Sequence, residues 1–348
     1  MSAPERQLSR RELNRALLAR QGLLERARAP LPRMVERMGC LQAQYAPSMY
    51  VGLWTRLEGM ARDDVTRALE RRALVQGWLM RITVHLASRA DYWPIALAVR
   101  EARRKVWLRT RKGEVGDAEM PEAAEIVRRR LEDAGQLHRK DVVALVGKPR
   151  AEGVGLWVDL VRVPPSGTWE RRRADVFGLA EAWIGPPGDV TAEQGVALVV
   201  RRHLSAFGPT TRADVAGWAG LPAGDIEPAL DALQLRRFRG PDGEELIDLP
   251  RAPLPDADTP APVRFLPWFD ATLLAHVRRT QILPEEYRPR VFNIKNPRSV
   301  APFLVDGAVA GGWYPEDGRI VLDPFERIDR GTRRALDEEA ERLAEFYA

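Results

Sequence analysis

The stretch from residue 190 to residue 249 constrains the fold of this chain more than any other, because it predicts three helices and then a hairpin. Residues 190–206 have helical periodicity, and the polar residues 209–214 open a second helix. A third helix is expected over residues 225–233. Two short strands then flank 241–243, a Pro-Asp-Gly turn. Three helices followed by a hairpin is the order of elements in a winged-helix module.

Three stretches rich in glycine and proline, at residues 113–121, 185–188 and 250–262, divide the chain into four segments. A chain of 348 residues is too long for one compact core, because domains usually have about 100–200 residues. We therefore expect several modules. Their predicted bounds are 1–115, 116–188, 189–255 and 256–348.

The second segment repeats the pattern of the third. After a predicted helix at 121–134, residues 137–147 align without gaps with 210–220 and match at Arg, Asp, Val and Gly. Because the matches occur in the same order of elements, they indicate an internal repeat. Residues 8–13 open a helix in a comparable way, so a third winged-helix module is expected in the first segment, with its wing near residues 79–86.

The last segment has a different pattern, in which strands dominate. Short strands are predicted at 263–270, 290–294, 303–313 and 319–322, and a closing helix at 330–346. Asp306 and Gly307 form a two-residue hairpin turn within this pattern. The predicted fold class is therefore α+β, with tandem winged-helix (helix-turn-helix) modules followed by a small β-barrel domain.

The composition excludes several classes of protein. Hydrophobic residues make up 45% and charged residues 30%, which fits a globular chain, and no apolar run approaches the roughly 20 residues that cross a bilayer. The N-terminus lacks the apolar stretch of a signal peptide, so a cytoplasmic protein without membrane contact is expected. With one cysteine, Cys40, and four scattered histidines, neither a disulfide nor a metal site is expected.

The net charge of +5 favours a polyanionic partner such as nucleic acid, although many proteins with this excess never bind one. Only five of the 54 basic residues are lysines. Arginine suits bidentate contacts to phosphate, but an arginine-rich composition also follows from a genome rich in G and C.

Standard catalytic motifs are absent from the sequence, which has no phosphate loop, dinucleotide fingerprint, HExxH or nucleophile elbow. What stands out is a pair of amides, Gln42 and Gln44, at the end of an apolar helix predicted at 31–41. Residues i and i+2 of an intact helix point about 200° apart, so a shared role requires the helix to break there. Pro47 favours a break, because proline disfavours helix at Ala46. The alternative is that both glutamines solvate a helix end.

Stretches along nearly the whole chain resemble the AlkZ/YcaQ family of winged-helix DNA glycosylases. They are Leu-Gln-Ala-Gln at 41–44, and residues 50–57, 79–86, 162–169, 207–218, 266–270 and 303–307. In that family a Gln-x-Gln or Gln-x-Asp motif serves catalysis, so the resemblance implies catalytic roles for Gln42 and Gln44, in the form typical of the AlkZ-like branch. It also implies a concave cradle of tandem winged helices with a β-barrel. Residues 293–299 depart from the Gly-containing turn usual before Phe303, which affects only the expected barrel.

A pair of amides fits a reaction that needs little base, because an amide is not a strong general base. A purine alkylated at N7 or N3 is cationic and leaves readily, through an oxocarbenium-like sugar. The two amide carbonyls would orient the attacking water. The predicted activity is therefore that of a monofunctional DNA glycosylase without a cofactor, in base excision repair or self-resistance. Its expected lesions are purines alkylated at N7 or N3, with bulky genotoxin adducts and interstrand crosslinks among them. No lysine stands out as a Schiff-base nucleophile.

DNA contacts are predicted for His85 and Arg81 in the first wing and for Arg171, Arg172 and Arg173 further along. A packed histidine and a solvated charged face are the alternatives. The partner would be duplex DNA containing alkylated purines, bound by a monomer. A non-enzymatic winged-helix transcription regulator is the other interpretation of this chain, and it would dimerise and prefer one sequence.

Overall fold

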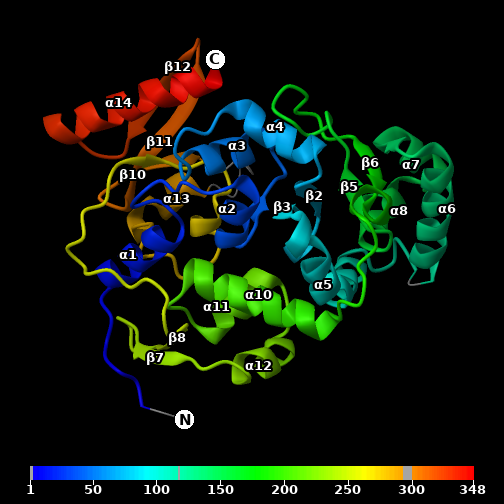
Figure 1. Ribbon diagram of the computed structural model, residues 1–348, viewed down its shortest axis with the longest axis horizontal. Helices are drawn as coiled ribbons and strands as arrows, with labels where there is room; N and C mark the ends of the chain where they lie inside the picture. The colour runs from blue at the N-terminus through cyan, green and yellow to red at the C-terminus, as the bar shows by residue number, and fades with distance from the viewer. Residues whose placement is uncertain (1–2, 117, 293–299) are drawn as a thin grey trace.

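The computed structural model describes residues 3–116, 118–292 and 300–348, in which helices and strands alternate along the chain (Figure 1). Its strands form antiparallel sheets of six, four and two strands. The mixture of helices and sheets confirms a fold of mixed α and β structure. In the part of the chain that is described, every helix is too short or too polar to cross a membrane.

The first segment begins with a helix that its own sequence caps. The Ser9 hydroxyl accepts a hydrogen bond from Glu12 N, and the Glu12 carboxylate accepts one from Ser9 N at 2.8 Å. The helices are α1 (Arg10–Arg20), α2 (Leu31–Arg37), α3 (Ala46–Trp54), α4 (Arg62–Glu70) and α5 (Arg89–Thr110), with a 3-10 turn η1 (Met80–Ile82). The strands are β1 (Leu41–Gln42), β2 (Leu74–Trp78) and β3 (Val84–Ser88). The wing predicted near residues 79–86 thus covers the turn and second strand of the β2–β3 hairpin.

The second segment extends the sheet that the first segment starts. Its helices are α6 (Glu119–Ala134), α7 (Arg139–Val146), α8 (Lys148–Gly153), η2 (Val154–Leu156) and α9 (Ala180–Ile184). Its strands are β4 (Leu137–His138), β5 (Leu160–Arg162) and β6 (Val176–Leu179). The six-stranded sheet has the order β1-β3-β2-β5-β6-β4, and Gly77 pairs with Val161 where the two segments meet. The first two segments therefore share one sheet.

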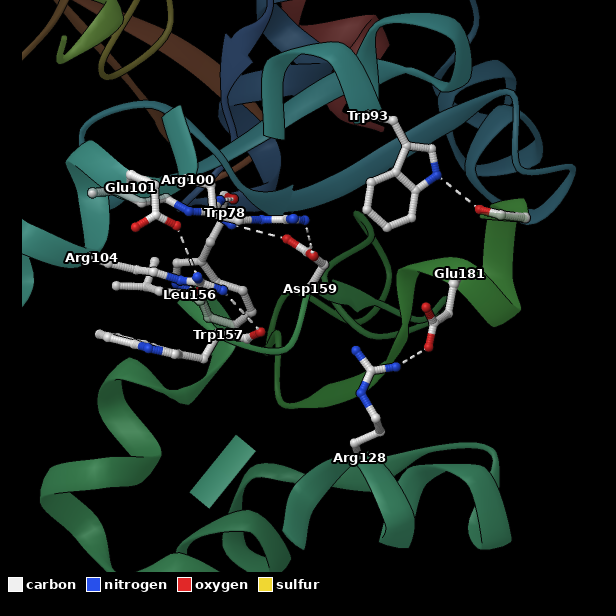
Figure 2. A network of polar contacts seen from close by, with 12 residues as sticks. Trp78, Trp93, Arg100, Glu101, Arg104, Arg128, Leu156, Trp157, Asp159 and Glu181 are labelled. Carbon is white, nitrogen blue, oxygen red and sulfur yellow. Dashed lines mark hydrogen bonds and ion pairs between the residues drawn. The ribbon is translucent and has the colours of Figure 1, made fainter. Parts of the chain in front are cut away.

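Arginines of α5 form hydrogen bonds with residues of the second segment near this junction (Figure 2). Asp159 accepts hydrogen bonds from Arg100 at 2.6 Å and from Arg103 at 2.9 Å, and only 13% of its side chain is exposed. Arg104 donates to the main-chain oxygen of Leu156 at 3.0 Å. Because these partners are far apart in sequence, the contacts hold α5 and the second segment in one arrangement.

The third segment has the predicted elements in the predicted order. They are α10 (Ala192–Phe207), α11 (Arg212–Ala219), α12 (Ala223–Asp231), β7 (Arg236–Arg239) and β8 (Glu245–Asp248). Thr191 and Thr211 each cap the helix that follows, as the threonine and serine preference for this position predicts. The helix α10 packs along α5, which attaches this segment to the first (Figure 1).

The two aligned stretches of the predicted repeat fold alike. Both α7 and α11 are eight residues long, and each begins at the matching arginine. Each ends before the matching glycine, Gly147 or Gly220, whose φ values are 77° and 70°. A positive φ is accessible to glycine without steric cost, so the matched glycine ends the helix in both copies.

The last segment forms an open sheet where a barrel was expected. Its strands β9 (Arg264–Phe265), β10 (Ala301–Val305), β11 (Ala308–Glu316) and β12 (Arg319–Pro324) pair in the order β12-β11-β10-β9. The prediction of a β-barrel was wrong for the described residues, because β12 and β9 do not pair to close the sheet. The closing helix α14 (Arg330–Tyr347) instead covers the sheet beside β12 (Figure 1). The sheet shares a buried core with α2 and α3, where Phe265 and Trp313 join Met34 and Tyr50.

Other local predictions for the last segment are compared with the structure residue by residue, and one of them needs correction. Residues 290–291, expected in a strand, end the short helix α13 (Arg288–Val291), which follows the 3-10 turns η3 (Ala271–Leu273) and η4 (Glu285–Tyr287). The hairpin turn at Asp306 and Gly307 is confirmed, with both residues at positive φ. The rest of the strand predicted at 290–294 and the divergent stretch 293–299 lie outside the described residues, apart from residue 292.

Candidate functional site

The two glutamines lie on one site because the helix before them ends early. The helix α2 ends at Arg37, and Gly39 and Cys40 follow with φ values of 72° and 76°, which no helix contains. Gln42 then lies on strand β1, and Gln44 lies in the loop before α3. The break predicted near Pro47 is therefore at Gly39, and Pro47 instead occupies the first turn of α3, where proline is tolerated.

The side chains of Gln42 and Gln44 contact each other. Gln42 Nε2 donates a hydrogen bond to Gln44 Oε1 at 2.9 Å. Gln42 is half-buried and Gln44 is exposed, so the pair lies at the surface. This bond does not use the Gln42 carbonyl oxygen, which can accept a hydrogen bond from a water molecule. The arrangement offers neutral donors and acceptors to a ligand and no charge.

The backbone between the two glutamines is held on both sides. Ala43 N donates to Val84 O at 2.7 Å, and Ala43 O accepts from Arg162 Nη1 at 2.6 Å. The same nitrogen of Arg162 also donates to Gln76 Oε1 at 3.1 Å, and Gln76 Nε2 donates to Gly167 O at 3.0 Å. A chain of hydrogen bonds from the second segment thus fixes the loop that carries the pair.

Arg162 is the functional candidate that the sequence reasoning missed. Only 9% of the residue is exposed, and burial lowers the pKa of its guanidinium to about 10. Its hydrogen-bond acceptors in the described structure are uncharged oxygens. An arginine between Val161 and Val163, on a strand with buried neighbours, was the signal that was available.

His85 lies directly across from Gln42 in the pairing of β1 with β3. Only 1% of His85 is exposed, and its Nδ1 lies 3.0 Å from Thr83 O. Burial, with a smaller effect from the charge of Arg81, lowers the pKa of His85 to about 3, so the ring is neutral at pH 7. His85 is therefore buried and exposes almost no surface that DNA could contact. Its position fits the alternative of a packed histidine.

Arg81 is turned toward the third segment. Its guanidinium donates to the main-chain oxygen of Trp218, and burial lowers its pKa to about 10. The backbone at Arg81 has a φ of 52°, in the region that favours glycine. This residue fastens the first hairpin to α11, and a contact with DNA stays a prediction.

The three consecutive arginines lie in the loop between β5 and β6, and all are exposed. Arg173 and Arg171 lie 2.9 Å and 3.5 Å from the carboxylate of Asp175, and Arg172 lies over the ring of Trp169 at 5.2 Å. Trp169 N donates to the hydroxyl of Tyr50 at 3.1 Å, so the loop is attached to α3.

The loop and the glutamine pair therefore flank the same helix, α3. No hydrogen bond or ion pair joins the three arginines to the two glutamines among the residues described. The structure brings Gln42, Gln44 and the missed Arg162 together through hydrogen bonds that the arginine run does not share.

Comparisons with known proteins find matches that cover most of the chain. The family described as DNA glycosylase AlkZ-like matches residues 35–346. The interstrand DNA cross-link repair glycosylase of Streptomyces sahachiroi is 24% identical over an alignment of 360 positions, which covers 94% of this chain and 93% of that protein. The solved structure of the Streptomyces sahachiroi DNA glycosylase AlkZ has the same fold, with a TM-score of 0.81 at 22% identity, over 97% of this chain and 96% of that one. The chain belongs to the family of AlkZ-like DNA glycosylases, so the predicted enzyme class is confirmed.

Proposed function

We propose that this enzyme hydrolyses the N-glycosidic bond of purines alkylated at N7 or N3 in duplex DNA, with Gln42 and Gln44 as its catalytic residues. The observation that carries the proposal is the contact between the two amides at the surface, 2.9 Å from nitrogen to oxygen. Two neutral amides suit a leaving group that is already positively charged, because such a base departs without being protonated.

The role of the pair is to place a water molecule below the anomeric carbon. An amide carbonyl orients a water through a hydrogen bond, and its dipole stabilises positive charge that develops on the sugar. A carboxylate at either position would be a stronger base and would serve less activated lesions. The neutral pair therefore selects lesions whose glycosidic bond is already weakened.

The hydrogen bonds of Arg162 support this role, because they hold the backbone that carries the two glutamines. Arg162 holds Ala43 O, and Ala43 lies between the two glutamines. A catalytic group that is already in place reorganises little when the transition state forms, and this lowers the barrier. Arg162 is thus a positioning residue, because it acts on the pair through the backbone.

The DNA would be bound by three winged-helix modules. The helices α10 to α12 and the hairpin β7–β8 form the third module, and the predicted repeat extends the arrangement to the first two segments. Arg171, Arg172 and Arg173 are the proposed phosphate contacts, since all three are exposed. The protein would bind as a monomer, with little sequence preference and strong salt dependence.

The size of the lesion is a further part of the proposal. The relative from Streptomyces sahachiroi is named for repair of interstrand cross-links. We extend the proposed substrates to bulky N7-guanine adducts and cross-links on that basis. The physiological role would be repair or resistance to a genotoxin.

The experiment measures release of 7-methylguanine, and of a bulkier N7-guanine adduct, from duplex DNA. Wild-type protein is compared with Gln42→Ala and Gln44→Ala, and Gln136→Ala is the control because Gln136 is exposed in another loop. We expect both site variants to lose release by at least about 100-fold while binding duplex DNA like wild type. A folded, DNA-binding wild type that releases neither base would contradict the proposed substrates, since an AlkZ-like glycosylase would then act on another lesion.

A further inference from the structure

A pocket of about 310 Å³ opens beside Gln44. Its lining consists of Gln44, Tyr45, Trp268 and Phe269. Three aromatic rings and one amide thus meet between the glutamine loop and the segment that follows β9. The volume lies at the lower end of the range, about 300–1,000 Å³, in which proteins bind small organic molecules. A larger pocket of about 540 Å³ near α11 and β8 includes neither glutamine.

The aromatic lining is built into the structure. The Tyr45 ring meets Trp268 edge to face, with centroids 5.5 Å apart and an interplanar angle of 87°. Trp268 in turn packs on Trp313, at 5.6 Å. Trp313 is buried, and its Nε1 donates to Leu266 O at 2.9 Å. Tyr45 itself is 38% exposed. Its ring is therefore not buried by the fold and is available to a ligand at the pocket mouth.

The backbone of the pocket wall is strained and anchored. Phe269 has a φ of 61°, a conformation that aromatic residues rarely adopt. The next residue, Asp270, is buried and accepts hydrogen bonds from Arg56 Nη2 at 2.8 Å and from Thr272 N at 3.0 Å. Strain of this kind persists only where the surroundings fix it, and it occurs often at binding sites.

We propose that this pocket receives the alkylated purine of a monoadduct, turned out of the base stack, with the ring against Tyr45 and Trp268. The proposal rests on the proposed function and adds the binding site for the base. An N-alkylated purine is planar and positively charged, and the faces of aromatic rings attract cations. Enzymes that act on a base commonly hold it between aromatic side chains outside the duplex.

The position of Gln44 connects the pocket to the reaction. Gln44 lines the pocket and is bonded to Gln42, so a base held there has both amides next to it. Among the residues that the structure describes, the lining contains no carboxylate and no cation. A neutral undamaged purine would gain stacking but not the attraction between charge and ring, which gives a preference for the lesion.

The test measures binding without cleavage. One duplex carries a single 7-methylguanine on 2′-fluoroarabinose, because fluorine disfavours the oxocarbenium-like transition state and keeps the bond intact. The matched duplex carries guanine at that position. The ratio of the two Kd values gives the preference for the lesion, for wild type, Tyr45→Ala and Tyr45→Phe. Tyr314→Ala is the control, because Tyr314 is a tyrosine of similar exposure on β11.

We expect wild type and Tyr45→Phe to prefer the lesion, and Tyr45→Ala to lose about tenfold of that preference, since the attraction between a desolvated cation and one aromatic ring contributes about that much. Trp268→Leu should lose at least as much, with its fold checked by circular dichroism. An unchanged preference in Tyr45→Ala, or none in wild type, would overturn the pocket assignment. Release of 7-methylguanine from the hydrolysable duplex tests the proposed function separately.

Discussion

The two sides of the candidate site are each supported by a buried arginine, and the two arginines have different partners. Under the aromatic pocket, Arg56 forms an ion pair with Asp270 at 2.8 Å, and their side chains are 0% and 1% exposed. Behind the glutamines, Arg162 donates to Ala43 O and Gln76 Oε1, which are uncharged. One cation is therefore neutralised, and the other is held by dipoles alone.

This difference separates a structural charge from a functional one. A buried ion pair contributes little net stability, but removing one partner leaves the other charge uncompensated and is strongly destabilising. A buried cation without a counter-charge lowers stability in the resting protein. Arg162 carries that cost where it donates to Ala43 O between the two glutamines, so we propose a positioning role for it and a structural role for Arg56.

The largest effect is expected from breaking the neutralised pair. Asp270→Asn leaves Arg56 buried without a counter-charge, so the free energy of unfolding should fall by about 3–5 kcal/mol. Urea denaturation measures it. Asp337→Asn is the control, because Asp337 pairs with Arg333 at an exposed site, and its change should stay within about 1 kcal/mol. A similar loss in both variants would show that burial of the pair is not what matters.

The second prediction removes the charge that lacks a counter-charge. Arg162→Met should reduce single-turnover release of 7-methylguanine by about 10- to 100-fold, because Ala43 O loses its donor and the pair its position. The free energy of unfolding should stay within about 2 kcal/mol of wild type, since a lost donor and a lost desolvation penalty offset each other.

Arg264→Met is the matched control for that variant. Arg264 is also buried, and its guanidinium donates to the main-chain oxygens of Val263 and Leu24, away from the glutamines. We expect it to keep wild-type rates. Full activity in Arg162→Met would remove this residue from the proposed mechanism.

A third prediction concerns His85, the neutral neighbour of the glutamine strand. Its folded pKa of about 3 lies below the unfolded value of about 6.5, so the unfolded chain binds the proton first. The stability from a neutral His85 is complete above pH 6.5 and is lost as the pH falls toward 3, by about 1.4 kcal/mol per pH unit. In His85→Leu the free energy of unfolding should depend less on pH in this range. Parallel curves for the two proteins would refute the assignment.

The smallest effect is expected at the exposed arginines. Arg173→Gln should lower the slope of log Kd against log salt concentration by about 0.9, the value for one lost phosphate contact. Fluorescence anisotropy at several salt concentrations measures the slope. Arg334→Gln on α14 is the control, because the two side chains are 85% and 83% exposed. Equal slopes would assign the arginine run to a solvated face.

Local signals made much of the fold predictable. The helices of the third segment follow from their periodicity and from the caps at Thr191 and Thr211, and the hairpin turn from Asp306 and Gly307. Each of these inferences needed only neighbours in the sequence. The spacing of the two glutamines also drew attention to them, but their catalytic role was implied only by the resemblance to a known family over nearly the whole chain.

Pairings between distant residues explain what could not be predicted. The barrel failed because closure depends on which strands meet, and the strands themselves do not encode that. Arg162 was missed because its partner, Ala43, lies 119 residues away. The helix break was predicted at the wrong place, near Pro47, because proline suits the start of a helix as well as the end of one. The helix α2 had already ended before Gly39, the glycine that precedes Cys40.

The backbone pairing of Gly77 with Val161 has a mechanical consequence for the duplex. It joins the first two segments into one continuous sheet, with β1 at one edge and β4 at the other. The span between those edges cannot change without breaking main-chain hydrogen bonds, so a duplex bound across both segments would have to bend to fit the protein. Bending a site of 20–30 base pairs costs on the order of 1–6 kcal/mol, and the cost is lower where base steps unstack easily. Binding of that kind would favour stretches of DNA that bend easily, without any contact to their bases.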